Sequence, residues 1–213
     1  MNWISRILPA RAAGPASSEA SGAVQRWQDA PEANLERSHY ETRYVLVNIE
    51  ASSLDRSAAQ MLSVAAIGID RGVIDLRDSY YAELGASPAN ALAGLLDFVG
   101  RQPVVMFNAG FHRLLVEGGF SRQFDFIPAW RYIDLYLLLP ALFPDRFEKP
   151  VRLAEWMRTF GIETFQRHHA LGDAWAIAQL FLAAQARALA RGVVCARALI
   201  DYEQTHREYR RRG

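Results

Sequence analysis

The segment from Tyr44 onward constrains the fold most, because three strand-like runs follow one another with short connections. Tyr44-Val45-Leu46-Val47 is a short apolar run with β-branched residues, which is typical of a buried central strand. Residues 62–69 form a second run of this kind, and Gly72 permits a tight return into residues 73–84, which alternate loosely. Three successive strands with short connections predict an antiparallel meander.

Beyond residue 86 the pattern changes to alternating helices and strands. Ser87-Pro88 supplies an N-cap and a proline at the first helical position, and Gly100 is the expected end of that helix. A helix from about residue 111 is expected to stop at Gly118-Gly119. The other expected elements are strands over 104–107 and 130–134 and helices over 135–143, 153–160 and 173–191. The order predicts an α/β domain with a mixed five-stranded sheet flanked by helices.

The 213 residues are enough for one domain with a substantial core, preceded by a different kind of segment. Residues 1–24 are dominated by Ala, Ser, Gly, Pro and charge, and we expect a disordered leader. The alternative is a partner-binding peptide around residues 3–8. We expect residues 25–42 to form a strap or short helix on the body, 43–192 the main domain, and 193–213 a C-terminal helix with an Arg-rich tail.

Charge and cysteine content limit the classes of function. The net charge of +1 gives no global attraction to nucleic acid or membrane, so a polyanion site has to be a local groove. The arginines of the tail are expected to be a solvated helix end, with a phosphate-backbone contact as the alternative. Cys195 is the only cysteine, which excludes an intrachain disulfide and a thiolate metal cluster. No run approaches the ~18 apolar residues of a membrane span, so we expect a cytoplasmic protein without a membrane partner.

Polar residues lie at the ends of two expected strands and at the start of a helix. Asn48 and Glu50 are two apart, so strand alternation puts both on one face at the edge where α/β sheets bind ligands. Asn108 follows the fourth strand, and His112 lies near the start of the next helix, where a histidine is more often a capping residue than a ligand. Asp173, at a helix start, could complete a Mg²⁺ site with Glu50.

Two histidines precede Asp173 in the loop before the long helix. An imidazole with a pKa near ~6.5 suits a base that deprotonates water, so His168 or His169 could serve in a phosphodiesterase. The alternative is a pair of solvated loop residues.

These segments together resemble the DEDDh family of 3′–5′ exonucleases, the DnaQ-like proteins that include the epsilon subunit of bacterial DNA polymerase III. The similarity covers roughly residues 43–190. Residues 168–174 match the family's H-x-A-L-x-D-A, residues 108–111 match N-A-x-F, and residues 48–50 fall where D-x-E is expected. The resemblance implies an RNase H-like exonuclease fold and a divalent metal, Mg²⁺ or Mn²⁺. It also implies single-stranded 3′ ends of DNA or RNA as substrate, and a polymerase or other protein partner.

The resemblance also implies roles for individual residues. Glu50 and Asp173 would hold the metal that activates the attacking water, and His168 would be the general base. Asn48 and His112 stand at metal-ligand positions where the family has aspartates. The residues expected to contact nucleic acid are Ala51, Ser53, Asn108 and Phe111, of which the first two replace a threonine and a glycine. Asp134 is expected to be structural.

Replacing two of four carboxylates changes the expected chemistry. An amide is a poor bridging ligand for Mg²⁺, and an imidazole suits Zn²⁺ or Mn²⁺ better. Weakening one metal of a two-metal site costs several kcal/mol of barrier, about a thousandfold in rate. We therefore expect a 3′-end-binding protein with impaired hydrolysis. The alternatives are an active exonuclease that uses Mn²⁺ or Zn²⁺ through His112, and a non-catalytic protein-interaction module. A groove rimmed by Arg113 and Arg167 would favour the impaired 3′-end-binding protein or the active exonuclease over the protein-interaction module.

Overall fold

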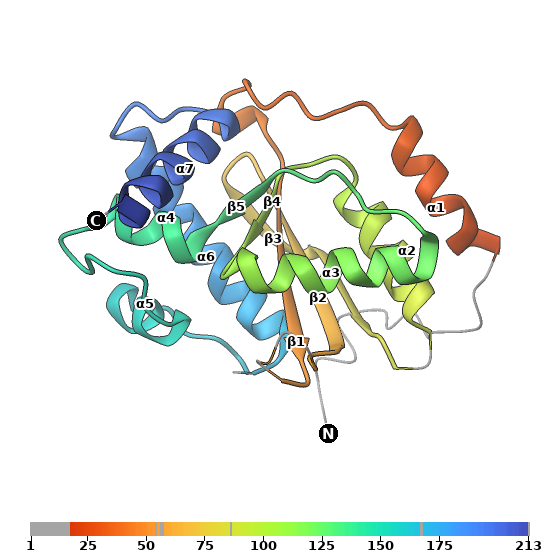
Figure 1. The fold of residues 1–213 in the computed structure, drawn as a ribbon. Coiled ribbons are helices and arrows are strands. Elements are labelled where there is room, and N and C mark those ends of the chain that lie inside the picture. The colour runs from red at the N-terminus through yellow and green to blue at the C-terminus, as the bar shows by residue number, and fades with distance from the viewer. Residues whose placement is uncertain (1–17, 54, 56–57, 86, 167, 213) are drawn as a thin grey trace.

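A mixed five-stranded sheet between two layers of helices forms the body of the protein (Figure 1). The computed structural model describes residues 18–212 apart from residues 54, 56–57, 86 and 167. The expectations for residues 1–17, including the peptide around residues 3–8, lie outside the described residues. Among the helices of the described part, none is both long enough and apolar enough to cross a lipid bilayer.

The sheet has the mixed topology that the sequence predicted. Its strands are β1 (Tyr44–Ala51), β2 (Met61–Asp70), β3 (Val73–Glu83), β4 (Val104–Met106) and β5 (Tyr132–Asp134), in the spatial order β3-β2-β1-β4-β5. β1, β2 and β3 form an antiparallel meander, and β1, β4 and β5 are parallel. The predicted fold class, three antiparallel strands followed by parallel βα units, is confirmed.

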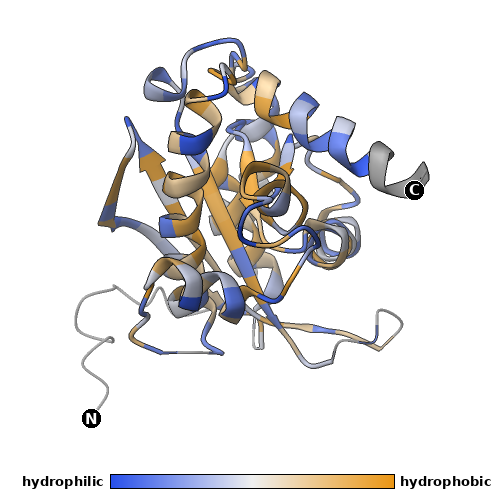
Figure 2. Ribbon diagram, turned by 90° about the vertical axis from the view of Figure 1, so that its left-hand side faces the viewer, coloured by the Kyte–Doolittle hydropathy of each residue, from blue (hydrophilic) through white to orange (hydrophobic). Residues whose placement is uncertain are grey.

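Strand alternation divides the apolar residues between two cores. Tyr44 and Leu46 of β1 belong to one core, and Val45, Val47 and Ile49 belong to the other. The first core lies under α4 (Leu135–Leu142), α5 (Leu153–Phe160), α6 (Ala170–Leu189) and α7 (Ala196–Arg212). The second lies under α1 (Ser18–Asp29), α2 (Pro88–Val99) and α3 (Ala109–Phe124). Figure 2 shows the apolar colour on the central strands and on stretches of the helices around them. Even-numbered β1 side chains therefore face α6.

The N-terminal helix corrects the expected leader. Helix α1 begins at Ser18, so the expectation of disorder was wrong for residues 18–24. Ala20, Ala23 and Trp27 are buried at helical spacing in the core beneath α1 and α2, and Arg26 pairs with Asp97 of α2 at 2.7 Å. Alanine offers little apolar surface, yet its small side chain allows α1 to pack closely on α2. The strap that follows includes a short 3₁₀ helix, His39–Glu41.

Helix α3 corrects a second expectation. It runs through Gly118-Gly119 to Phe124 and ends at Asp125, which has a φ of 49°. A Cβ on Gly119 would lie 2.6 Å from Met61 Cε and 3.2 Å from a Leu92 methyl group. This glycine therefore permits close packing between helix and sheet and does not terminate the helix.

Candidate active site

The end of β1 meets the start of α6 at the edge of the sheet. Asn48 is 5% exposed, and its Nδ2 donates a hydrogen bond to the Ala170 carbonyl oxygen at 3.2 Å. Glu50, two residues further along β1, shares the face of Asn48 and is half-buried. A hydrogen bond between neutral groups thus fastens the strand to the first residue of the helix.

Asp173 lies in the first turn of α6, which begins at Ala170, three residues before the predicted start. Its side chain is buried, and its backbone N–H donates to the His169 carbonyl oxygen at 3.0 Å. A carboxylate in the first turn is stabilised by the helix dipole. The structure therefore places Glu50 and Asp173 on the two elements that Asn48 joins.

The loop before α6 carries the two histidines in different environments. His168 is exposed and has a φ of 56°, a left-handed conformation that is uncommon for a residue other than glycine. His169 is the N-cap residue of α6, and its ring stacks on Tyr81 of β3 with centroids 5.1 Å apart. Of the two, His168 is the histidine open to solvent.

Close packing against Gly172 holds this loop on the helix. Thr164 Oγ1 donates to the Gly172 carbonyl oxygen at 2.7 Å. A Cβ on Gly172 would overlap the carbonyl oxygen of Gln166. The loop that carries His168 can lie this close to α6 only because residue 172 has no side chain.

His112 lies in the first turn of α3 and is largely buried. Its Nδ1 has no hydrogen-bond partner among the described residues. Burial lowers the pKa of the imidazole to about 4, so His112 is neutral at neutral pH.

In the described part of the chain, His112 does not form a complete metal-ligand group with Glu50 and Asp173. Within the described residues, no three His, Cys, Asp or Glu side chains form a group that could hold a metal ion. Helices α3 and α6 cover opposite faces of the sheet, but both begin at the edge where the parallel strands β4 and β1 end. Ligation of Mn²⁺ or Zn²⁺ through His112 therefore stays a prediction.

The expected nucleic-acid contacts divide into one buried and three accessible residues. Phe111 is only 6% exposed and belongs to the core beneath α3, so its ring presents no face to a base. Asn108 is exposed and caps α3 in a left-handed conformation with a φ of 63°. Ala51 follows a register shift in β1, and Ser53 Oγ accepts the Asp55 backbone N–H at 3.0 Å. The expectation for Phe111 was wrong, because its aromatic ring packs inward.

Asp134 ties the end of β5 to neighbouring helices. It is 3% exposed, and its carboxylate accepts the Tyr136 backbone N–H at 3.0 Å and interacts with the backbone N–H groups of Asn108 and Ala109. Its own backbone N–H donates to Glu203 of α7 at 2.9 Å. These contacts agree with the structural role expected for Asp134.

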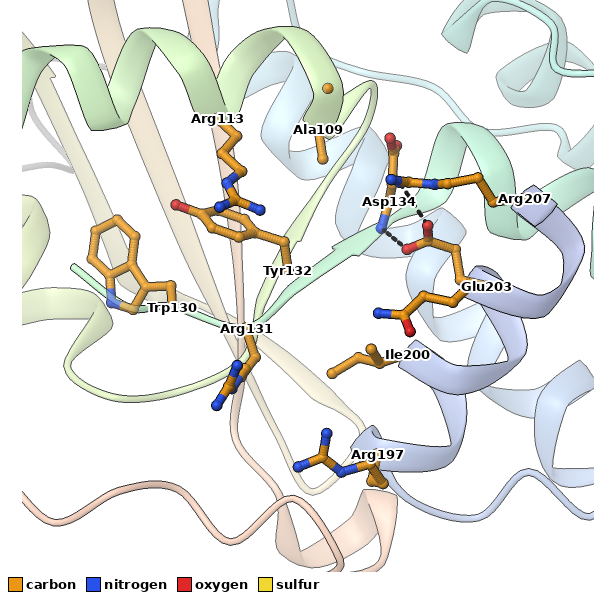
Figure 3. A pocket seen from close by; sticks show the side chains of 12 residues that line it. Ala109, Arg113, Trp130, Arg131, Tyr132, Asp134, Arg197, Ile200, Glu203 and Arg207 are labelled. Carbon is orange, nitrogen blue, oxygen red and sulfur yellow. Dashed lines mark hydrogen bonds and ion pairs between the residues drawn. The ribbon is translucent and has the colours of Figure 1, made fainter. Parts of the chain in front are cut away.

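The structure contains a basic pocket beside the start of α3 that the sequence did not predict. Its volume is about 260 Å³, and it lies between α3, β5 and α7 (Figure 3). Arg113, expected at the rim of a groove, lines this pocket, whereas Arg167 lies outside the described residues. The other three arginines are Arg131, next to the start of β5, and Arg197 and Arg207 of α7. Only tertiary packing brings β5 and α7 together. No local pattern in the sequence signals such a pocket.

Comparisons with known proteins connect this geometry to a fold. No protein-family model matches the chain, and no curated protein matches it in sequence. Among solved structures, exonuclease I is similar with a TM-score of 0.59 and 17% identity over 78% of this chain. The complex of E. coli exonuclease I with a dT13 oligonucleotide is similar with a TM-score of 0.57 and 16% identity over 69%. This chain has the fold of one part of exonuclease I.

The zinc-bound form of the E. coli exonuclease I–ssDNA complex is similar as well, with a TM-score of 0.58 and 18% identity over 78% of this chain. The chain spans less than half of the exonuclease I chains, 44%, 42% and 43% of the three in turn. The likeness therefore concerns the domain of five strands and flanking helices described above, and not the rest of exonuclease I.

Burial of His112 predicts that stability falls in acid. The unfolded imidazole titrates near ~6.5, and the folded one at about 4, so the unfolded state binds more protons between these values. Stability should therefore decrease as pH drops below ~6.5, by up to about 3 kcal/mol near pH 4. His39, whose pKa is also lowered by burial, acts in the same direction.

Urea unfolding at pH 7.5 and pH 4.5 measures this effect. His112→Gln should lose part of the acid sensitivity and His39→Gln a separate part. An unchanged difference between the two pH values in His112→Gln would contradict the prediction.

Proposed function

We propose that this protein binds 3′ ends of single-stranded nucleic acid and hydrolyses them weakly or not at all. The observation that carries the proposal is the Asn48 hydrogen bond to the Ala170 carbonyl oxygen. An ionised aspartate at this position could not donate this bond. The amide holds β1 against α6 without a metal ion, which suits a site adapted to work without a bridging ligand.

The donors at this edge fit a reduced metal site. Glu50 and Asp173 offer carboxylates, and Asn48 offers an amide oxygen, a set that suits one hard cation such as Mg²⁺ or Mn²⁺. A ready site for two cations is not formed, because no third ionisable side chain of the described residues completes a ligand group with Glu50 and Asp173. A single bound cation would attract phosphate oxygens, while His168 lies exposed beside the site.

Binding of nucleic acid is supported by fold and by local charge. E. coli exonuclease I has been solved with a dT13 oligonucleotide, and this chain shares the fold of one part of it. The pocket beside the α3 start is lined by four arginines, a lining expected for a phosphate backbone and not for an apolar protein contact. Both DNA and RNA are proposed as the strand that is bound. A polymerase partner, of the kind that the epsilon subunit has, would deliver the 3′ end.

Binding and hydrolysis can be tested separately with labelled oligonucleotides. In EDTA, the protein should bind single-stranded DNA or RNA with a free 3′ end more tightly than the same strand with its 3′ end closed in a hairpin. With Mg²⁺, Mn²⁺ or Zn²⁺, denaturing gels should show no more product than His168→Ala and Asp173→Ala give. A Mn²⁺-dependent ladder that both variants abolish would instead identify an active exonuclease. Absence of binding to every strand would refute the proposal and favour the protein-interaction module.

A further inference from the structure

The pocket between α3, β5 and α7 has a charge excess that its own contacts do not neutralise. Two of its lining groups are the carboxylates of Asp134 and Glu203, each 3% exposed. Glu203 accepts the Asp134 backbone N–H at 2.9 Å and pairs with Arg207 at 2.8 Å. Burial raises the pKa of both carboxyl groups. Asp134 and Glu203 are therefore hydrogen-bonded within the protein, and these bonds hold the inner wall of the pocket in place.

The outer wall of the pocket is formed by three further arginines, Arg113, Arg131 and Arg197 (Figure 3). Arg113 lies over the Tyr132 ring, 4.9 Å from its centroid, and pairs with Glu117 at 2.7 Å. Arg197 makes only a loose contact of 3.5 Å with the exposed Glu36. Arg131 is exposed, and within the described part of the chain no group pairs with its guanidinium. Arg131 and Arg197 therefore offer two cationic groups at the same opening.

The shape and lining indicate what such an opening would bind. A guanidinium presents paired N–H donors that match the oxygens of a phosphate. Trp130 is 5% exposed and Tyr132 is covered by Arg113, so neither offers an open ring face on which a base could stack. A volume of about 260 Å³ suits a single sugar-phosphate unit. The chemistry is that of a backbone contact without base recognition.

The pocket is adjacent to the candidate active site. Both involve the start of α3: Ala109 and Gly110 line the pocket, and the predicted site residues Asn108 and His112 flank them in the sequence. We propose that Arg131 and Arg197 bind a backbone phosphate of the single strand, several nucleotides from the 3′ end held near Glu50 and Asp173. This inference rests on the proposed function and adds a second contact, one that acts only on strands long enough to reach it.

Strand length and salt dependence test this contact. The full-length protein in EDTA is titrated into 5′-fluorescein-labelled dT3 and dT12, and binding is followed by anisotropy. The Arg131→Ala, Arg197→Ala double variant should bind dT12 about tenfold more weakly, with a salt dependence shallower by about 0.7 for each phosphate that is no longer neutralised. Its affinity for dT3 should not change.

A matched control separates this contact from net charge. Arg77→Ala, Arg158→Ala removes two exposed arginines from β3 and α5, whose partners are Asp75 and Glu155, and should leave both affinities unchanged. Equal losses of affinity in the two double variants, or equal losses for dT3 and dT12, would overturn the pocket proposal alone. Wild-type protein that binds neither strand would overturn the proposed function with it. Displacement of dT12 more readily by hexaglutamate than by unlabelled dT12 would overturn the phosphate assignment and point to an acidic protein partner.

Discussion

Changing both Asn48 and His112 to aspartate is expected to raise Mg²⁺-dependent 3′-end hydrolysis about a thousandfold above wild type. The double variant supplies the two carboxylates that the DEDDh pattern has and this chain lacks. The new carboxylate at position 48 would offer a bridging ligand beside Glu50 and Asp173. The one at position 112 would place a negative charge in the first turn of α3, where the helix dipole favours an anion. Product formation from a labelled oligonucleotide measures the gain.

The same variant has a readout that does not depend on turnover. In EDTA, the carboxylate at position 48 would face the Ala170 carbonyl oxygen that Asn48 now contacts, at a cost of about 1–3 kcal/mol. Mg²⁺ should offset this cost, so it should raise the melting temperature of the double variant and leave that of the wild type nearly unchanged. Adding Asp173→Asn should remove both the metal response and the activity. A metal response without hydrolysis would show that the site lacks more than these two ligands.

Replacing Gly172 with alanine is expected to lower stability by about 3 kcal/mol and to weaken 3′-end binding at least tenfold. The added Cβ would overlap the Gln166 carbonyl oxygen, a backbone atom that can move only with the whole loop. That movement would break the Thr164–Gly172 hydrogen bond and displace His168. Urea unfolding and oligonucleotide anisotropy measure the two effects.

Gly110→Ala is the matched control for this prediction. Gly110 also lies in the first turn of a helix, but a Cβ there would have no atom within 4 Å. Alanine should therefore leave stability unchanged or raise it by up to about 1 kcal/mol, because alanine favours helix more than glycine does. If Gly172→Ala were as stable as this control, the loop would not be held by close packing.

Local patterns predicted the parts of this fold that local physics determines. The apolar run at Tyr44 gave a strand, and the cap at Ser87-Pro88 with the stop at Gly100 gave a helix, each close to its observed place. Strand alternation was also sufficient to put Asn48 and Glu50 on one face. These features depend on residues only a few positions apart.

The errors concern residues whose role is decided by distant partners. Gly119 was expected to end a helix, yet it accommodates Met61 and Leu92. Phe111 was expected at a binding surface and packs into the core. In each case the deciding neighbour is distant in the sequence and becomes visible only in the assembled fold.

The contacts of Asp134 have a consequence for how two occupied sites would influence each other. This residue joins the starts of α3 and α4 to Glu203 of α7, so the basic pocket and the candidate active site share one buried hydrogen-bonded junction. If a phosphate bound in the pocket shifts this junction, the affinity of the candidate active site for a 3′ end changes. Thermodynamic linkage then requires that a bound 3′ end change the affinity of the pocket by the same factor. The junction thus provides a physical route for cooperativity within one strand-binding surface.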